Sequence, residues 1–315
     1  MTTTMIDWLT ALVPCYHPAP ITGGKVMKIT PEGQIEWQVD SRLPVVGSHE
    51  SSLLVRTYGV FRDQSGEKRG ASLEISGNPT KWLQGHNLFG GIPEPGPLLE
   101  LMMYRLCEIL PGLQPTDLDL QRWAEGIHQI LRIDLTRMYA LGTRERVRAW
   151  LRGAEHSAYM RHRGRGTLVK NGTLYFGQGS KRWSLKFYGK GDELEAGKGH
   201  GLAKGLAELF PDLLAWASDK LRSEVTLRSK EIKQRGLRLA CNWAESTGAE
   251  IVNVIAGGLQ MSDQMALPAT AIADIALRAP RLRMAYEAWQ NGADLREILP
   301  KNTFYRYRRE LLPHG

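Results

Sequence analysis

The sequence is short of cysteines and lacks any long hydrophobic run. Its three cysteines, Cys15, Cys107 and Cys241, are odd in number and widely separated, so they form neither a disulfide framework nor a zinc ribbon. No run reaches the roughly 18 apolar residues that a membrane-spanning helix needs, and the first residues lack the basic region and cleavage site of a signal peptide. We therefore expect free thiols in a cytoplasmic protein.

The composition is that of an ordinary globular protein with a basic excess. Of the 315 residues, 42% are hydrophobic and 8% aromatic, which is enough for one substantial core and a smaller module. Lys and Arg total 41 against 33 Asp and Glu, a net charge of +8. This charge favours a polyanionic partner and by itself leaves nucleic acid and anionic membrane both open.

Hydrophobic periodicity predicts a strand-rich first part and a mostly helical last part. Short strands alternate with turns up to about Ser76, and apolar residues recur at helical spacing from Leu98 to Ile109, before Pro111. Further along, the pattern predicts a strand over 129–140, a basic helix over 143–152, a hairpin over 167–188, a helix over 201–220 and a strand over 222–229. We expect an α+β fold, with an antiparallel sheet flanked by helices over 1–245 and a smaller α-helical domain over 246–315.

Three predicted strands each carry a carboxylate in their polar row. Because successive strand side chains point to opposite faces, Glu74 lies opposite Leu73 and Ile75, Asp134 opposite Ile133 and Leu135, and Glu224 opposite Val225 and Leu227. Gathered on one sheet face, the three carboxylates would suit Mg²⁺ or Mn²⁺. The alternative, weighted equally, is three solvated faces with cross-strand arginine–carboxylate pairs.

A fourth strand places a tyrosine between two lysines. In residues 183–193, Lys186, Tyr188 and Lys190 share the polar row, opposite Leu185 and Phe187. A phenol normally ionises near pH 10, and adjacent ammonium groups would favour its anion and make it a better nucleophile. Considered alone, however, a strand tyrosine more often packs or lies at the surface.

Four separated segments resemble a known family. They are LEISGNPTKWLQGHNLFG (73–90), RIDLT (132–136), LYFGQGSKRWSLKFYGKGDELE (174–195) with LRSEVTLRSKEIKQRGL (221–237), and LPKNTFYRYRREL (299–311). In order and spacing they resemble the gene II replication initiators of filamentous phages and, more distantly, plasmid rolling-circle initiators of the Rep_trans group. The string KWLQGHNLFG is the most specific, because neither periodicity nor propensity explains it.

The resemblance implies a site-specific endonuclease and strand transferase that nicks a duplex origin. Tyr188 matches the attacking tyrosine, which would form a 5′-phosphotyrosine and leave a 3′-OH primer, with Lys190 and Lys186 beside it. Asp134, Glu224 and Glu74 match acidic positions. None of the eight histidines forms the His-hydrophobe-His pair of better-known rolling-circle nucleases, which favours a carboxylate-rich Mg²⁺ or Mn²⁺ site with His86 as a further candidate ligand or as an orienting residue of its loop.

Basic residues supply candidate DNA contacts. These are Arg132, Arg222 and Arg228 in the site strands, Arg163 and Arg165 in the RHRGRG loop, and Thr303, Arg306 and Arg309 in a C-terminal segment that resembles a helix-turn-helix. The alternative for each arginine is a solvated surface position. The implied partners are double-stranded origin DNA, single-stranded DNA, host helicase and polymerase in the bacterial cytoplasm, with a homo-oligomer on DNA and no membrane.

Two rival functions fit the same residues. A metal-dependent nuclease that activates water would use the carboxylates and lysines without a covalent intermediate. A non-catalytic protein that binds single-stranded nucleic acid would use its basic strands and tryptophans for neutralisation and stacking. Loss of cleavage on replacing Tyr188 separates the first rival from the tyrosine mechanism, and cleavage itself excludes the second.

Overall fold

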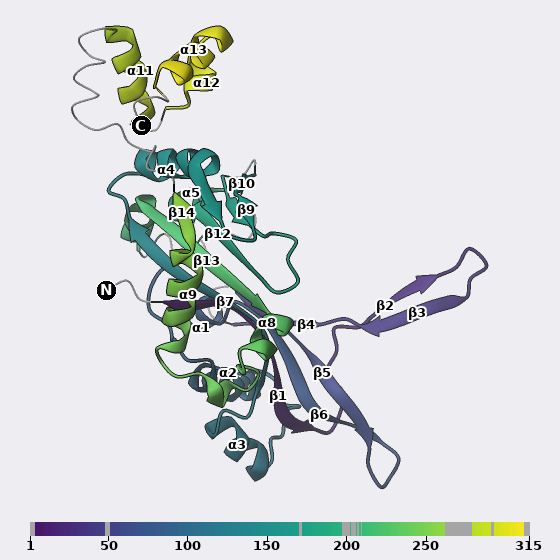
Figure 1. Cartoon of the computed structure of the whole chain (residues 1–315). Coiled ribbons are helices and arrows are strands. Elements are labelled where there is room, and N and C mark those ends of the chain that lie inside the picture. Colours follow the sequence, from purple (N-terminus) through teal and green to yellow (C-terminus); the bar gives the residue numbers. More distant parts are fainter. Residues whose placement is uncertain are drawn as a thin grey trace.

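A computed structural model describes residues 4–47, 51–169, 172–196, 202, 206, 208, 210–261, 279–290 and 293–311. Its centre is a nine-stranded sheet in the order β10-β11-β12-β13-β7-β1-β6-β5-β4, and every neighbouring pair is antiparallel. Helices flank this sheet and form the C-terminal part (Figure 1). The expected α+β class is therefore confirmed.

The sheet draws its strands from most of the chain. They are β1 (Met5–His17), β4 (Leu43–Val46), β5 (Ser52–Arg62), β6 (Lys68–Gly77), β7 (Gln129–Ala140), β10 (Thr167–Leu168), β11 (Leu174–Phe176), β12 (Trp183–Gly189) and β13 (Lys220–Arg228). A separate sheet holds β8 (Ala158–Met160), β9 (Gly164–Arg165) and β14 (Leu259–Met261).

Helices flank the sheet, and several of them bury the apolar rows of its central strands. The flanking helices are α1 (Pro79–Gln84), α2 (Pro95–Ile109), α3 (Asp117–Ala124), α4 (Arg144–Ser157), α5 (Lys190–Glu195), α7 (Asp212–Ser218), α8 (Ser229–Gln234) and α9 (Thr247–Gly257), with a short 3-10 turn η2 (Ala240–Asn242). Leu135 and Val225 from the sheet share one core with Leu98 of α2, Val147 of α4 and Ile251 of α9. The opposite rows of β7, β12 and β13 are thereby left for polar side chains.

Several expected boundaries differ from the structure, and two of the differences involve residues at or near the Tyr188 strand and its neighbour. The strand that contains Tyr188 ends at Gly189, and Lys190 begins α5. The helix expected to reach residue 220 instead ends at Ser218, because Lys220 pairs with Ala140 and extends β13. Most of the N-terminal half of that expected helix lies outside the described residues. Both differences arise from sheet pairing, which local periodicity does not report.

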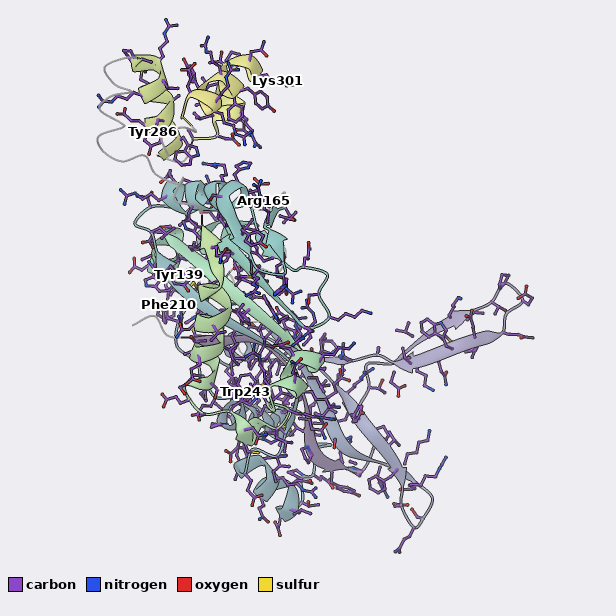
Figure 2. The ribbon with its side chains drawn as sticks, in the orientation of Figure 1. Tyr139, Arg165, Phe210, Trp243, Tyr286 and Lys301 are labelled. Atoms are coloured by element: carbon purple, nitrogen blue, oxygen red, sulfur yellow. The ribbon has the colours of Figure 1, made fainter. Side chains whose placement is uncertain are left out.

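A two-stranded arm projects from the body between β1 and β4. It consists of β2 (Lys25–Ile29) and β3 (Ile35–Asp40), and every residue of both strands is exposed. The arm extends far from the sheet (Figure 1), and its side chains point into solvent along its length (Figure 2). At its base, Gly23 N–H donates to Ser41 O at 3.0 Å and Ser41 N–H donates to Gly24 O at 2.9 Å. Backbone hydrogen bonds thus close the base of the arm by joining its two ends before the chain enters the sheet.

The C-terminal part begins within the main core. Helix α9 lies beyond residue 245, and its Ile251, Val252 and Ile255 pack in the main core. The expected domain boundary at 245/246 stays a prediction. Beyond it lie α11 (Pro280–Gln290), α12 (Leu295–Ile298) and α13 (Lys301–Leu311), which contain a small apolar cluster around Leu282 and Tyr286. Among the described residues, no helix has the length and apolar character to cross a membrane.

Candidate active site

The polar rows of three adjacent strands meet at the predicted tyrosine. In the register of the sheet, Lys186 of β12 lies opposite Glu224 of β13, which lies opposite Thr136 of β7. Two residues along, Tyr188 lies opposite Arg222. The alternation read from the sequence therefore brings Tyr188, Lys186 and Glu224 to one face of the sheet, as predicted.

Tyr188 and Glu224 form the centre of this site. The Tyr188 hydroxyl donates a hydrogen bond to Glu224 Oε2 at 3.2 Å, and Lys186 Nζ lies 2.7 Å from Glu224 Oε1. Tyr188 is 6% exposed and Glu224 3%. Burial raises the pKa of the Tyr188 phenol well above its usual value. Burial, together with the nearby Asp7 carboxylate, raises the pKa of Glu224 to about 8, so this carboxylate is unusually basic.

A second carboxylate, Asp7, enters the site through a β-bulge. Ile6 pairs with Leu135 and Trp8 pairs with Asp134, so β1 has one extra residue at position 7. The bulge turns Asp7 toward the polar face, where its Oδ1 lies 2.7 Å from Arg222 Nη2. Although burial opposes ionisation, Arg222 and Lys190 lower the pKa of Asp7 to about 2. Alternation within the strand does not predict this placement.

Two asparagines hold Asp7 and connect it to Lys190. Asn78 caps the start of α1 and donates from Nδ2 to Asp7 Oδ1 at 2.7 Å. Asn87 donates to the same oxygen at 2.6 Å and accepts a hydrogen bond from Lys190 Nζ at 3.1 Å. The backbone carbonyl oxygen of Asn87 accepts a hydrogen bond from Arg222 Nη1 at 3.0 Å. The QGHN turn, conspicuous in the sequence, therefore serves the site through Asn87.

Lys190 is a buried cation at the edge of the site. It is 1% exposed, forms an ion pair with Glu193 on α5, and follows Tyr188 by two residues. Burial and the positive charge of Arg222 lower its pKa to about 8. This lowered pKa lets Lys190 exchange a proton near neutral pH. Lys190 begins helix α5, whereas the sequence had predicted that it continues the strand.

Comparison with known proteins identifies the family. Residues 5–246 match the Phage CRI family, which is described as the N-terminal part of a replication-associated protein. A curated relative, the replication-associated protein of Enterobacteria phage I2-2, is 36% identical over 314 residues, which cover 99% of this chain and 87% of that protein. The chain belongs to the Phage CRI family. This membership confirms the resemblance to gene II-type initiators.

A solved structure adds a more distant similarity. The rolling circle replication initiator protein from Geobacillus stearothermophilus is 13% identical and covers 83% of this chain and 87% of that one, with a TM-score of 0.35. This score is too low to establish a common fold. Membership in the Phage CRI family therefore rests on the sequence matches.

The remaining predicted carboxylates of this Phage CRI family member lie apart from Tyr188 or carry other partners. Glu74 of β6 lies opposite Leu12, four residues along β1 from Trp8, the partner of Asp134; this is roughly 13 Å along the strand. Glu74 accepts hydrogen bonds from Arg42 at 3.0 Å and Arg56 at 2.7 Å. The expectation that Glu74 joins Asp134 and Glu224 in one site is corrected by this register.

Asp134 and His86 have local roles in the structure. Asp134 accepts two hydrogen bonds from Arg132, at 2.9 and 2.6 Å. His86 packs against Phe89, with ring centroids 4.8 Å apart, and its Nδ1 lies 3.3 Å from Gln84 Nε2. His86 thus has contacts that orient its turn, which was the alternative to a ligand role.

The oxygen donors near Tyr188 do not form a preassembled metal site. Asp7, Glu224 and Asp134 are each paired with a basic side chain, namely Arg222, Lys186 and Arg132. Among the described residues, no group of three or more His, Cys, Asp and Glu side chains is arranged to hold a metal ion. A divalent cation at Asp7 and Glu224 would have to displace one of these basic partners.

The predicted DNA-binding residues divide between the site and the surface. Arg222 is fully buried in its pair with Asp7, which corrects the expectation that it contacts DNA. Arg165 is exposed on β9 (Figure 2), and Arg163 stacks 4.2 Å from the Trp183 ring. On α13, Arg306 and Arg309 are exposed and Thr303 is half-buried. Their contact with DNA remains a prediction.

The raised pKa of Glu224 predicts a pH-dependent stability difference. The folded state binds the Glu224 proton more tightly than the unfolded state, because folding raises the pKa from 4.5 to about 8. The resulting stabilisation is complete below pH 4.5 and is lost as the pH rises through 8. We expect urea unfolding to show wild type losing stability relative to Glu224→Gln between pH 5 and 8. A difference that is constant with pH would contradict the raised pKa.

Proposed function

We propose that the chain initiates rolling-circle replication as a site-specific single-strand endonuclease and strand transferase. The observation that carries this proposal is the hydrogen bond from the Tyr188 hydroxyl to the buried, basic carboxylate of Glu224. A phenol in a neutral form needs a proton acceptor before it attacks phosphorus, and Glu224 lies within hydrogen-bonding distance. Membership in a family of phage replication-associated proteins fits this chemistry.

In the proposed reaction, Tyr188 Oη attacks the scissile phosphorus while its proton passes to Glu224. A phosphorus–Oη bond forms and the bond from phosphorus to the 3′ oxygen breaks, so the products are a 5′-phosphotyrosine and, after proton uptake from water, a 3′-OH. Lys186 and Lys190 supply positive charge for the phosphate oxygens. A later 3′-OH attacks the phosphotyrosine and regenerates the phenol, which is the strand-transfer step.

We propose that nicking requires Mg²⁺ or Mn²⁺. Carboxylate oxygens are the ligands these cations prefer, and Asp7 and Glu224 are the carboxylates whose charges act on each other beside Tyr188. A bound cation would stabilise negative charge on the phosphate. A cation there would first have to displace one of the basic partners, Arg222 or Lys186.

The proposed partners follow from the products. The chain, with its net charge of +8, would bind double-stranded origin DNA and the single strand released from it. The 3′-OH is a primer for host polymerase, and strand displacement requires a host helicase. The proposed location of the reaction is the bacterial cytoplasm, and the proposed assembly is a homo-oligomer on DNA.

The proposal is tested on supercoiled DNA that carries the cognate origin. With Mg²⁺, we expect an open-circular product and DNA that stays attached to protein after denaturation. EDTA is expected to abolish the product, and added Mn²⁺ to restore it. A nick without any protein-linked DNA at early times would favour the water-activating nuclease, and no nick on a verified origin would favour the binding protein.

A further inference from the structure

Two arginines lie directly opposite each other on neighbouring strands, on the face of the sheet that carries Tyr188. Arg132 of β7 and Arg228 of β13 are directly paired in the register. Like charges at directly opposite positions of an antiparallel pair destabilise the sheet. The remainder of the site shows the reverse arrangement, because each of its buried carboxylates has a basic partner.

The charge of this pair is only partly neutralised. Asp134 accepts two hydrogen bonds from Arg132 and neutralises its charge. For Arg228, the described residues provide one side-chain hydrogen bond, to the uncharged hydroxyl of Ser184 at 3.3 Å. Burial, followed by the charge of Arg132, lowers the pKa of the Arg228 guanidinium. The pair therefore retains an excess positive charge within the protein.

The arginine pair lies on the same polar row as the reactive groups. Along β13, this row runs from Arg222 through Glu224 and Thr226 to Arg228. Arg228 is four residues from Glu224, roughly 13 Å along the strand. Burial decreases in this direction, from 0% exposure at Arg222 to a half-buried Arg228, and the Arg132 side chain is 44% exposed. A strand of DNA can thus reach the arginines from solvent.

We propose that Arg132 and Arg228 bind one internucleotide phosphate of the strand being cut, at a position separate from the scissile phosphate. A planar guanidinium donates paired hydrogen bonds that match phosphate oxygens, and an anion between the two arginines removes their repulsion. The subsite rests on the proposed nicking function. It fixes how far the strand extends across the sheet when its scissile phosphate is at Tyr188.

The test is a neutral-phosphate scan of single-stranded origin DNA. Each oligonucleotide carries one methylphosphonate, which removes the charge of one phosphate, and binding is measured in a Tyr188→Phe background so that no strand is cut. We expect one position to weaken binding about tenfold. At that position alone, combining the modification with Arg228→Ala should give no further loss, whereas Arg105→Ala on α2 should leave the scan unchanged.

A stability measurement separates a binding role from a structural role. If the role of Arg228 is to bind a phosphate, Arg228→Ala removes the repulsion between Arg228 and Arg132, and the melting temperature of the variant without DNA should equal or exceed that of the parent. Arg228→Lys should keep part of the affinity for single-stranded DNA. A lower melting temperature, or equal effects of Arg228→Ala at every modified position, would overturn the subsite. If wild type fails to nick while the scan still shows the single position, the nicking proposal fails and the subsite stands.

Discussion

Replacing Tyr188 with phenylalanine is expected to abolish both nicking and protein-linked DNA. The substitution removes the only atom of this side chain that can bond to phosphorus, and no other group on the ring can replace it. The buried ring keeps its packing, and Glu224 keeps its pair with Lys186. The loss of one hydrogen bond should therefore lower the free energy of unfolding by only about 1 kcal/mol.

A neighbouring tyrosine provides the matched control. Tyr175 on β11 lies directly opposite Lys186 and is half-buried, so it shares the neighbourhood of the site and not the hydrogen bond to Glu224. Nicking of supercoiled origin DNA and protein-linked label after denaturation should persist in Tyr175→Phe. A covalent product that survives in Tyr188→Phe and disappears in Tyr175→Phe would assign the nucleophile to the other strand.

Asp7→Asn is expected to reduce both stability and activity. The change leaves Arg222, which is completely buried, without its counter-ion, and breaking one side of a buried ion pair lowers the free energy of unfolding by about 3 kcal/mol or more. Loss of the Asp7 charge also disturbs the positions of Arg222 and Lys190 beside Tyr188, so we expect nicking to fall by roughly 10- to 100-fold. Urea unfolding and initial nicking rates measure the two effects.

Two further variants separate the effects of Asp7. Asp192→Asn on α5 is the control, because Asp192 likewise pairs with arginine side chains, those of Arg144 and Arg148, but is 28% exposed. The change should lower the free energy of unfolding by about 1 kcal/mol or less. The double change Asp7→Leu with Arg222→Met removes both buried charges and should recover stability without recovering nicking. Full nicking in that double variant would show that the pair serves folding alone.

The polar face of the sheet could be predicted from the sequence because side chains alternate between the two faces wherever a strand is regularly paired. This alternation correctly grouped Lys186, Tyr188 and Glu224, and the 129–140 strand appears with the predicted bounds. Alternation does not give the offset between strands. Glu74 therefore has the right face and the wrong position along it, since register depends on pairing across the whole sheet.

The missed residues depend on events that local pattern does not encode. Asp7 reaches the site because a bulge interrupts alternation in β1, and no composition signal marks such a bulge. Asn87 lies in a turn whose sequence is unusual, but its neighbour His86 is the side chain there that suits a metal ligand. Only the tertiary contacts to Asp7, Lys190 and Arg222 identify the asparagine as the residue that joins the turn to the site.

The closed base of the β2–β3 arm has a consequence for how the chain tolerates change. Since Gly23, Gly24 and Ser41 complete their backbone hydrogen bonds across the base, residues beyond them can be added or removed in pairs without shifting the register of β1 or β4. Lengthening such a loop costs little free energy. The arm is therefore the natural place for inserted tags or labels, and a segment where related chains can differ in length while the face of the sheet that carries Tyr188 keeps its geometry.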